Sequence, residues 1–271
     1  MFKKMFGSLL KVFVGGEKMV GHGRTDQGAV RSNNEDSIYV ENGTIGALDN
    51  LYIVSDGMGG HNAGEVASSK AIEFFNSFIK SADFSCYNGD YEAFLSDAVK
   101  NANSSVNAIS KGDPTLLGMG ATFTALTFVE KRAIIAHLGD SRVYSKNGTG
   151  VLKQLTIDHT YVNELVNSGV ITAEQAKTHH LRNIITRALG TDSKCDVDTY
   201  TIDMTDEVAF LMCSDGLNTM LDDDEINNIL EKEYKNNVET MATAVDALIE
   251  TSNKKGGHDN ISVIMIMEGG I

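Results

Sequence analysis

The chain of 271 residues is poor in the residue types that mark several large classes of protein. It has one proline, no tryptophan and three cysteines, and no two cysteines show the Cys-x-x-Cys spacing of a metal or redox motif. This cysteine usage indicates a reducing, intracellular compartment, and we expect a cytoplasmic protein. Cys213 lies in the apolar run VAFLMCS, so we expect a packed strand residue there and no nucleophile.

Basic residues and long apolar runs are also scarce. The chain has 23 Lys and Arg against 37 Asp and Glu, and its net charge is −14. Non-specific binding of nucleic acid requires a basic surface, so we expect no nucleic-acid partner. No stretch approaches the roughly 18 consecutive apolar residues of a membrane span. The sequence has neither a His-x-x-x-His pair nor a G-x-x-x-x-G-K-[ST] loop, which argues against zincin hydrolases and P-loop enzymes.

Residues 1–18 form a basic amphipathic extension. Apolar residues recur at helical spacing from Phe2 to Phe13, and three lysines lie between them. A segment of this kind can lie on an anionic membrane surface, so residues 1–14 are a candidate for weak, peripheral membrane contact. The alternatives are a frayed tail or a chain that starts at Met19. A small-residue cleavage site is missing, which argues against a secretory signal.

Residues 19–271 are expected to form one domain. Hydrophobic periodicity predicts helices at residues 63–80, 91–110, 222–231 and 238–251. It predicts strands at residues 51–55, 121–130, 132–138, 142–145, 151–155, 198–202, 208–213 and 261–267. A polar stretch at 158–187 carries two short helical patterns and is expected to be an insertion over a sheet. Short turns between strands, with helices segregated, predict an α+β fold of two antiparallel sheets packed face to face and flanked by α-helices.

Acidic residues beside glycine or asparagine are the most informative feature of the chain. Asp56, Asp140 and Asp215 each follow an apolar run, which places their carboxylates at the ends of strands. A single Asp-Gly pair is an ordinary turn signal, but three such pairs after strands favour a shared role. Converging carboxylates repel one another unless hard cations lie between them. The sequence therefore predicts an oxygen-ligand site for Mn²⁺ or Mg²⁺, with two ions.

Further candidates lie beside these acids. Asp259 begins the last strand, and Asn260 can hold it in place. Glu35 and Asp36 are adjacent, and neighbouring side chains of an extended segment point to opposite sides. We therefore expect Asp36 to bind an ion directly and Glu35 to act through bound water; two surface acids are the alternative. Gly57 can turn its backbone carbonyl toward an ion.

Two more residues suit a reaction at phosphate. Arg31 lies five residues before Asp36 and can bind a phosphate with two parallel hydrogen bonds; the alternative is a surface salt bridge. His61 follows two glycines near Asp56 and can donate a proton to a leaving group; the alternative is a plain loop histidine.

Taken together, the motifs resemble the PP2C-type (PPM family) metal-dependent protein serine/threonine phosphatases in their bacterial form. The resemblance covers residues 21–267 and rests on six segments in order, TDQGAVRSNNED, DGMGGH, GMGAT, GDSR, SDGL and GGHDN. It implies the four-layer sandwich of that family, with the family's flap at residues 158–187. It also implies hydrolysis of phosphoserine and phosphothreonine in proteins by a water activated between two metal ions. The expected partners are phosphorylated proteins, including a bacterial Ser/Thr kinase, and a monomer is the default.

The resemblance also implies roles for individual residues. It makes Asp56 the carboxylate that bridges two metals, with Gly57 adding its backbone oxygen. It places Asp215 and Asp259 on one metal. It places Asp36 and Glu35 on the other side, partly through water.

Other positions match the family less evenly. Asp140 matches the acid that binds a third, weaker metal in bacterial members, and Arg31 matches the phosphate-binding arginine. Animal members carry a histidine directly after the Asp-Gly pair, where this chain has Met58. The proton can therefore come from His61 or from metal-bound water. His180 stands where relatives usually have proline.

Two rival functions remain from the sequence. The first is a pseudophosphatase that serves as a binding module, and the intact set of acids argues against it. The second is a partner-switching phosphatase of anti-sigma-factor antagonists. Those relatives generally lack the flap pattern, which favours the general protein phosphatase.

Overall fold

The structure is a computed structural model that describes residues 18–60, 63–205 and 207–269. Two antiparallel sheets form its centre, as the sequence predicted. One sheet contains, in spatial order, β1 (Met19–Asp26), β11 (Ile261–Glu268), β10 (Glu207–Cys213), β7 (Arg142–Asn147) and β8 (Leu152–Gln154). The other contains β2 (Asp36–Glu41), β3 (Leu51–Met58), β5 (Phe123–Val129), β6 (Arg132–Leu138) and β9 (Asp198–Asp203). The short strand β4 (Gly120–Ala121) pairs with the end of β3.

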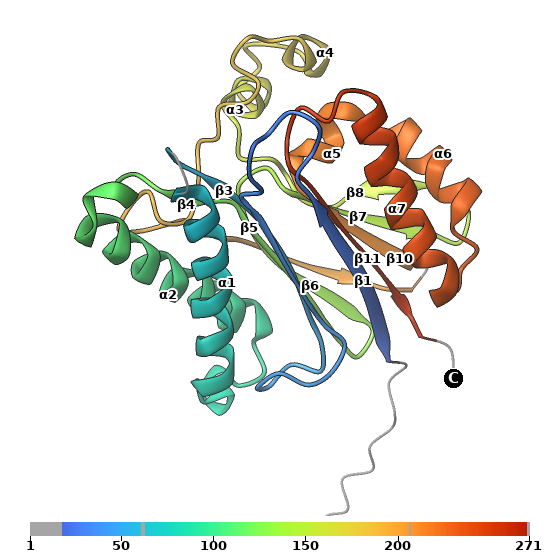
Figure 1. Ribbon diagram of the computed structural model, residues 1–271. Helices are drawn as coiled ribbons and strands as arrows, with labels where there is room; N and C mark the ends of the chain where they lie inside the picture. The colour runs from blue at the N-terminus through green and yellow to red at the C-terminus, as the bar shows by residue number, and fades with distance from the viewer. Residues whose placement is uncertain (1–17, 61–62, 206, 270–271) are drawn as a thin grey trace, which may run out of the picture.

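Helices cover the outer face of each sheet (Figure 1). The sheet that contains β3 is covered by α1 (Ala63–Ser81) and α2 (Tyr91–Gly112). The sheet that contains β11 is covered by α5 (Asp215–Met220), α6 (Asp223–Glu233) and α7 (Val238–Lys254). The order helix, sheet, sheet, helix confirms the four-layer sandwich.

Three hydrophobic cores hold the four layers together. A single strand can contribute to two of these cores, because its side chains alternate between its two faces, and successive residues of β10 do so. Leu211 and Cys213 belong to the core under α6 and α7, whereas Phe210 and Met212 belong to the core between the two sheets. A third core joins α1 and α2 to the sheet of β3. The central strands of both sheets are thus buried on both faces.

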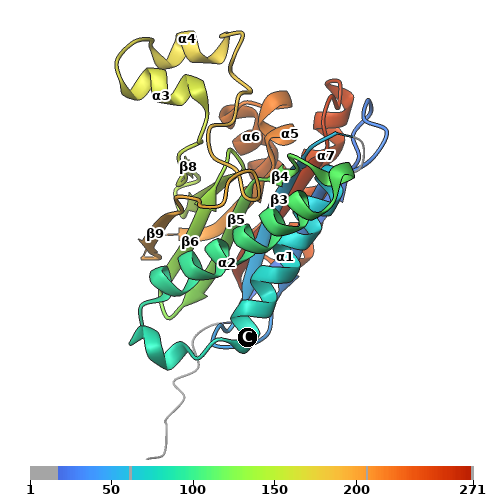
Figure 2. The same cartoon turned by 90° about the vertical axis from the view of Figure 1, so that its left-hand side faces the viewer.

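Residues 158–187, here called the flap segment, carry the two short helices α3 (Tyr161–Asn167) and α4 (Ala173–Lys177). Both short helical patterns expected from the sequence are therefore present. The segment stands off one end of the sandwich (Figures 1 and 2). Its two ends pair at the root, where the Tyr161 N–H donates to the Ile184 carbonyl (2.8 Å).

The sequence prediction was wrong or incomplete at a few elements. Strands β1 and β2 and helix α5 were not predicted, and β3 continues beyond residue 55 to Met58. The expected strand at 121–130 is interrupted at Thr122, whose N–H donates to the Asp56 carbonyl (2.8 Å) while its own carbonyl accepts from the Ser55 hydroxyl (2.7 Å). The proposed extension at residues 1–18 lies almost wholly outside the described residues. Within them, no helix is long and apolar enough to cross a membrane.

Candidate metal centre

Asp36 and Asp56 lie directly opposite each other on neighbouring strands. Asp36 is the first residue of β2, and the antiparallel register pairs it with Asp56 of β3. Asp56 follows a run of fully buried residues, so its backbone is fixed by packing on both faces of the sheet. The Thr122 hydroxyl accepts a hydrogen bond from the Asp56 N–H (2.9 Å). The strand pairing therefore holds two carboxylates close together inside the sandwich.

Asp215 and Asp259 reach the same region from the other sheet. Asp215 begins α5 directly after β10, and Asp259 lies just before β11. A Cβ atom on Gly216 would come within 2.0 Å of the Asn260 carbonyl oxygen, so only glycine lets these two segments approach so closely. Their neighbours also fix Asp36, because the Ser214 and Ser262 hydroxyls both donate to its Oδ2 (2.7 Å each).

Asp140 enters through the turn between β6 and β7. Gly139, just before it, has φ of +114°, a conformation that favours glycine, and a Cβ there would lie 2.6 Å from the Thr122 side chain. Asp140 itself is only 7 % exposed. The turn, which joins a strand of one sheet to a strand of the other, therefore brings a fifth carboxylate to the centre.

Burial and mutual repulsion raise the pKa values of this cluster. Burial, opposed by the serine hydrogen bonds, raises the pKa of Asp36 to about 7, and burial together with Asp259 raises that of Asp215 to about 6. Burial followed by repulsion raises the pKa of Asp56 and Asp140 well above the ordinary value. Asp56 is repelled by all four other aspartates, which places it at the electrostatic centre of the group.

The polar atoms of the cluster fit hard divalent cations. One carboxylate oxygen, Oδ1, of each of Asp36, Asp140 and Asp215 is buried without a hydrogen-bond partner, which is costly unless a cation takes that place. In the described part of the chain, no three acidic, histidine or cysteine side chains are arranged so that they could by themselves hold one ion. Mg²⁺ needs no such enclosure, because it commonly takes one or two carboxylates and keeps several waters. Ions shared among these aspartates are compatible with both observations.

Glu35 and Gly57 lie where the centre meets α1. The Glu35 carboxylate lies against Gly64 and accepts from the Asn33 side chain (3.3 Å), away from the serines that hold Asp36. The Gly57 N–H donates to the Glu35 carbonyl (3.1 Å). A Cβ on Gly57 would lie 2.0 Å from the Gly64 carbonyl oxygen, so this close approach also requires glycine.

Arg31 lies beside the carboxylates with its side chain 47 % exposed. Its Nη2 donates to Asp259 Oδ2 (2.9 Å). Asn260 holds the loop that carries it, because its side-chain amide donates to the Gln27 and Asn33 carbonyls (2.9 and 2.8 Å) and accepts from the Glu35 N–H (2.9 Å). The Arg31 side chain therefore remains partly exposed to solvent beside Asp259. His61, the candidate proton donor, lies outside the described residues.

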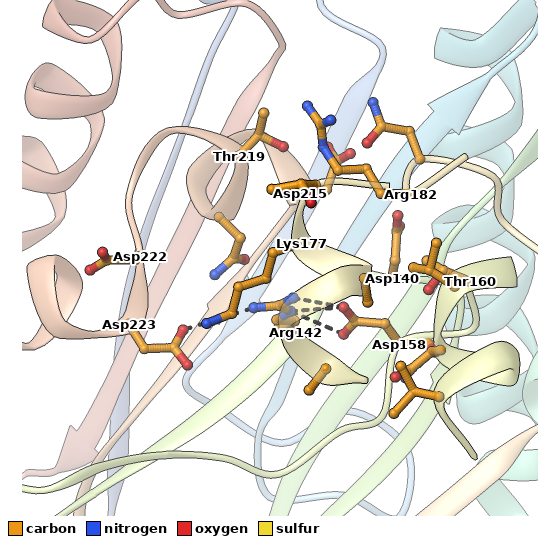
Figure 3. A pocket seen from close by; sticks show the side chains of 18 of the residues that line it. Asp140, Arg142, Asp158, Thr160, Lys177, Arg182, Asp215, Thr219, Asp222 and Asp223 are labelled. Atoms are coloured by element: carbon orange, nitrogen blue, oxygen red, sulfur yellow. Dashed lines mark hydrogen bonds and ion pairs between the residues drawn. The ribbon is translucent and has the colours of Figure 1, made fainter. Parts of the chain in front are cut away.

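A cavity of about 830 Å³ opens beside the centre, between the flap segment and helices α5 and α6 (Figure 3). Asp140 and Asp215 line its inner end, and Asp222 and Asp223 lie on its outer side. Arg142 also lines the cavity and binds Asp158, with an Nη2–Oδ2 distance of 2.7 Å. The cavity therefore leads from the surface to two of the carboxylates.

Several residues of the site were not predicted from the sequence. The hydroxyls of Ser214, Ser262 and Thr122 fix the aspartates, and serine or threonine beside an acidic motif was the only signal for them. Cys213 is buried in the core under α6 and α7, as expected, and burial raises the pKa of its thiol to about 12. A thiol of that kind is no nucleophile.

Comparison with known sequences decides the family. Residues 25–261 match the family described as protein phosphatase 2C. The chain belongs to the protein phosphatase 2C family. The family predicted from the six motifs is thereby confirmed, and with it the enzyme class, over the binding-module alternative.

Individual members of the protein phosphatase 2C family are similar along nearly the whole chain. The serine/threonine phosphatase stp of Listeria monocytogenes is 36 % identical over 245 residues, which cover 90 % of this chain and 93 % of that protein. The crystal structure of Stp1 from Staphylococcus aureus has a TM-score of 0.83 at 32 % identity and covers 94 % of this chain and 97 % of that one. The PstP catalytic domain, solved with two manganese ions, has a TM-score of 0.75 at 35 % identity and covers 93 % and 99 %.

Proposed function

We propose that this chain removes phosphate from phosphoserine and phosphothreonine in proteins, and that it needs two Mn²⁺ or Mg²⁺ ions. The observation that carries the proposal is the cluster of buried aspartates with raised pKa values and unpartnered oxygens, centred on Asp56. Bound ions would supply Lewis acidity that lowers the pKa of water and offsets the charge on phosphate. The two manganese ions of the related PstP catalytic domain support the same ion count.

The proposed ligands divide between the two sheets. Asp56 would contact both ions, with the Gly57 carbonyl beside it, and Asp215 and Asp259 would hold one ion. Asp36 would hold the other directly, and Glu35 would act through water. The Ser214 and Ser262 hydroxyls keep the Asp36 carboxylate oriented before any ion arrives. Asp140 would hold a third, weaker ion.

Arg31 would orient the phosphate of the substrate. Its guanidinium is about half exposed and forms an ion pair with Asp259 (2.9 Å). Two parallel N–H groups suit two phosphate oxygens and offset their charge as it develops. His61, two glycines after Met58, would supply a proton to the leaving serine or threonine oxygen. The cavity beside the centre has room for the side chains that flank a phosphorylated residue.

The proposed setting follows from the same chemistry. The substrates would be phosphorylated proteins, among them a Ser/Thr kinase that this phosphatase opposes. We propose residues 19–271 as one catalytic domain that acts as a monomer in the cytoplasm, with the flap at 158–187. Weak membrane contact through residues 1–14 remains a proposal, because those residues lie outside the described ones.

Hydrolysis of a phosphothreonine peptide by the purified full chain tests the proposal. Phosphate release should require Mn²⁺ or Mg²⁺ and stop when EDTA is added. The Asp56→Asn variant, checked by circular dichroism, serves as the folded control, and its phosphate release should be roughly 10³-fold slower or more. Release that continues in EDTA, or no release from folded protein with either metal, would contradict the proposed function.

A further inference from the structure

His159 lies at the root of the flap segment and forms two hydrogen bonds to the turn that carries Asp140. Its Nδ1 accepts a hydrogen bond from the Gly139 N–H (3.0 Å), and its own backbone N–H donates to the Gly139 carbonyl (2.8 Å). His159 is only 6 % exposed, so both hydrogen bonds are shielded from water. The residue directly before Asp140 is thus held on both its polar backbone groups by one flap residue.

The other ring nitrogen of His159 binds Asp198 of β9, and Asp198 in turn binds the far end of the flap segment. Because Nδ1 accepts from Gly139, the ring proton sits on Nε2, which donates to Asp198 Oδ2 (3.0 Å). Arg187, at the end of the flap segment, donates to the other oxygen of Asp198 (2.9 Å). The Thr186 N–H donates to the His159 carbonyl (2.8 Å). Both ends of the flap segment therefore meet at His159, through its backbone carbonyl and through Asp198.

The backbone conformation of Gly139 depends on these hydrogen bonds. Its φ of +114° is held by few residue types, and a Cβ would collide with the Thr122 side chain. A glycine here is free to adopt other conformations once its hydrogen bonds are lost. A rotation about Gly139 would change the position of the Asp140 carboxylate relative to Asp215 and Asp56.

We propose that His159 is a positioning residue that fixes the Gly139–Asp140 turn and joins it to the root of the flap segment. The affinity of Asp140 for a divalent ion then depends on the hydrogen bond between Gly139 and His159. This inference rests on the proposed function, because Asp140 must hold an ion. His159 itself does not touch the substrate or the reacting atoms.

Three substitutions separate the two hydrogen bonds of the imidazole. The amide oxygen of His159→Asn takes the place of Nδ1, so it can still accept from Gly139 but loses Asp198. The amide nitrogen of His159→Gln takes the place of Nε2, so it can still donate to Asp198 but loses Gly139. His159→Leu has a similar volume and makes neither hydrogen bond. Thermal unfolding of each variant in EDTA shows that it is folded.

The first readout needs no metal. Amide hydrogen exchange of a peptide that covers residues 138–142, measured in EDTA, should become faster in the Leu and Gln variants. It should stay near the wild-type rate in the Asn variant. A general loss of structure would instead speed exchange along the whole chain in all three variants, and that result would overturn the inference.

The second readout is Mn²⁺ binding, measured by calorimetry on the full chain. The weakest ion should bind about tenfold or more weakly in the Leu and Gln variants, as is usual when a residue behind a metal ligand is lost. The Asn variant should restore most of that affinity, and the tighter ions should be unaffected. Affinity restored by His159→Gln as fully as by His159→Asn, or exchange and affinity unchanged in His159→Leu, would overturn the role of His159. Wild type that binds no Mn²⁺ at all would contradict the proposed function as well.

Discussion

The aspartate centre and the flap segment differ in how the fold holds them. Asp36 and Asp56 pair across two buried strands, and buried serine hydroxyls fix the Asp36 carboxylate. In the flap segment, Val162 is the only buried residue of α3, α4 has none, and Val170 is 67 % exposed. The centre is therefore stabilised by packing of the whole sandwich, whereas the flap is held at its root. Segments with so few buried contacts open at low free-energy cost.

From this difference we expect the rigid part to carry the chemistry and the loosely packed part to contact the protein substrate. Metal ligands require sub-ångström placement, which paired strands provide. A segment that covers a cavity of about 830 Å³ can adjust to different peptides without moving the carboxylates. The predictions that follow test whether the two regions are separate in this way.

The largest effect is expected at the centre itself. Asp56→Asn removes the carboxylate that faces the four other aspartates, so turnover should fall roughly 10³-fold or more, equal to about 4 kcal/mol of lost transition-state stabilisation. The same change replaces a buried carboxyl group, whose pKa is raised by burial and by its acidic neighbours, with a neutral amide. The metal-free variant should therefore unfold at a higher urea concentration than wild type. Near-normal activity with Mn²⁺, or a lower unfolding midpoint, would contradict the central place of Asp56.

His61→Gln should have the next largest effect, and it should depend on the leaving group. Loss of a proton donor should slow hydrolysis of a phosphoserine peptide by about 10²-fold or more. Hydrolysis of p-nitrophenyl phosphate should change little, because its leaving group is stable without a proton. Equal slowing of both substrates would show that His61 acts in some other way.

Gly216→Ala tests the close approach of α5 to the strand-borne ligands. The new Cβ would lie 2.0 Å from the Asn260 carbonyl oxygen, so α5 and Asp215 must shift. We expect the free energy of unfolding to fall by about 1–3 kcal/mol and Mn²⁺ to bind more weakly. Gly112→Ala, where nothing lies within 4 Å of the new Cβ, is the matched control and should leave Mn²⁺ binding unchanged. Equal Mn²⁺ binding by both variants would contradict the argument.

These residues also show how far the sequence could predict the site. Asp56, Asp140, Asp215 and Asp259 could be chosen because each stands beside glycine or asparagine next to an apolar strand. The pairing of Asp36 with Asp56 could not, because register follows from packing and β2 itself was not predicted. The serine hydroxyls that fix Asp36 come from segments more than 170 residues away, and no local pattern reports such a contact. The layers were predictable because apolar periodicity is a local signal.

The pH dependence of stability tests the charge state of the centre. Folded-state pKa values of about 7 for Asp36 and about 6 for Asp215 exceed the unfolded value of about 3.9. The folded state therefore holds more protons than the unfolded state between about pH 4 and pH 7. Without metal, the free energy of unfolding should fall as pH rises through this window, by about 1.4 kcal/mol per pH unit for each such proton. Urea titrations in EDTA measure the slope.

The Asp56→Asn variant is the control for that slope, because it removes part of the repulsion and should flatten the pH dependence. In wild type, saturating Mn²⁺ should remove most of the pH dependence of stability, since bound ions displace the protons. A wild-type stability that rises steadily from pH 4 to pH 7 in EDTA would contradict the buried, repelling cluster.

The smallest effect is expected in the flap segment. Thr172 and Gln175 form a capping box at α4, and Asp222 and Glu225 form the same motif at α6. Asp222→Ala should lower the global free energy of unfolding by about 1 kcal/mol, because α6 packs on the sandwich core. Thr172→Ala should leave it unchanged and speed amide exchange only around residues 172–178. Equal global losses would show that the two regions unfold as one unit.

The central claim is that Asp56 lies between two divalent ions. Anomalous scattering from crystals of the full chain grown with Mn²⁺ tests it most directly. The account predicts two manganese peaks on opposite sides of Asp56, both within coordination distance of its carboxylate, with Asp215 and Asp259 on one peak and Asp36 on the other. A single ion, or two ions that Asp56 does not contact, would contradict it.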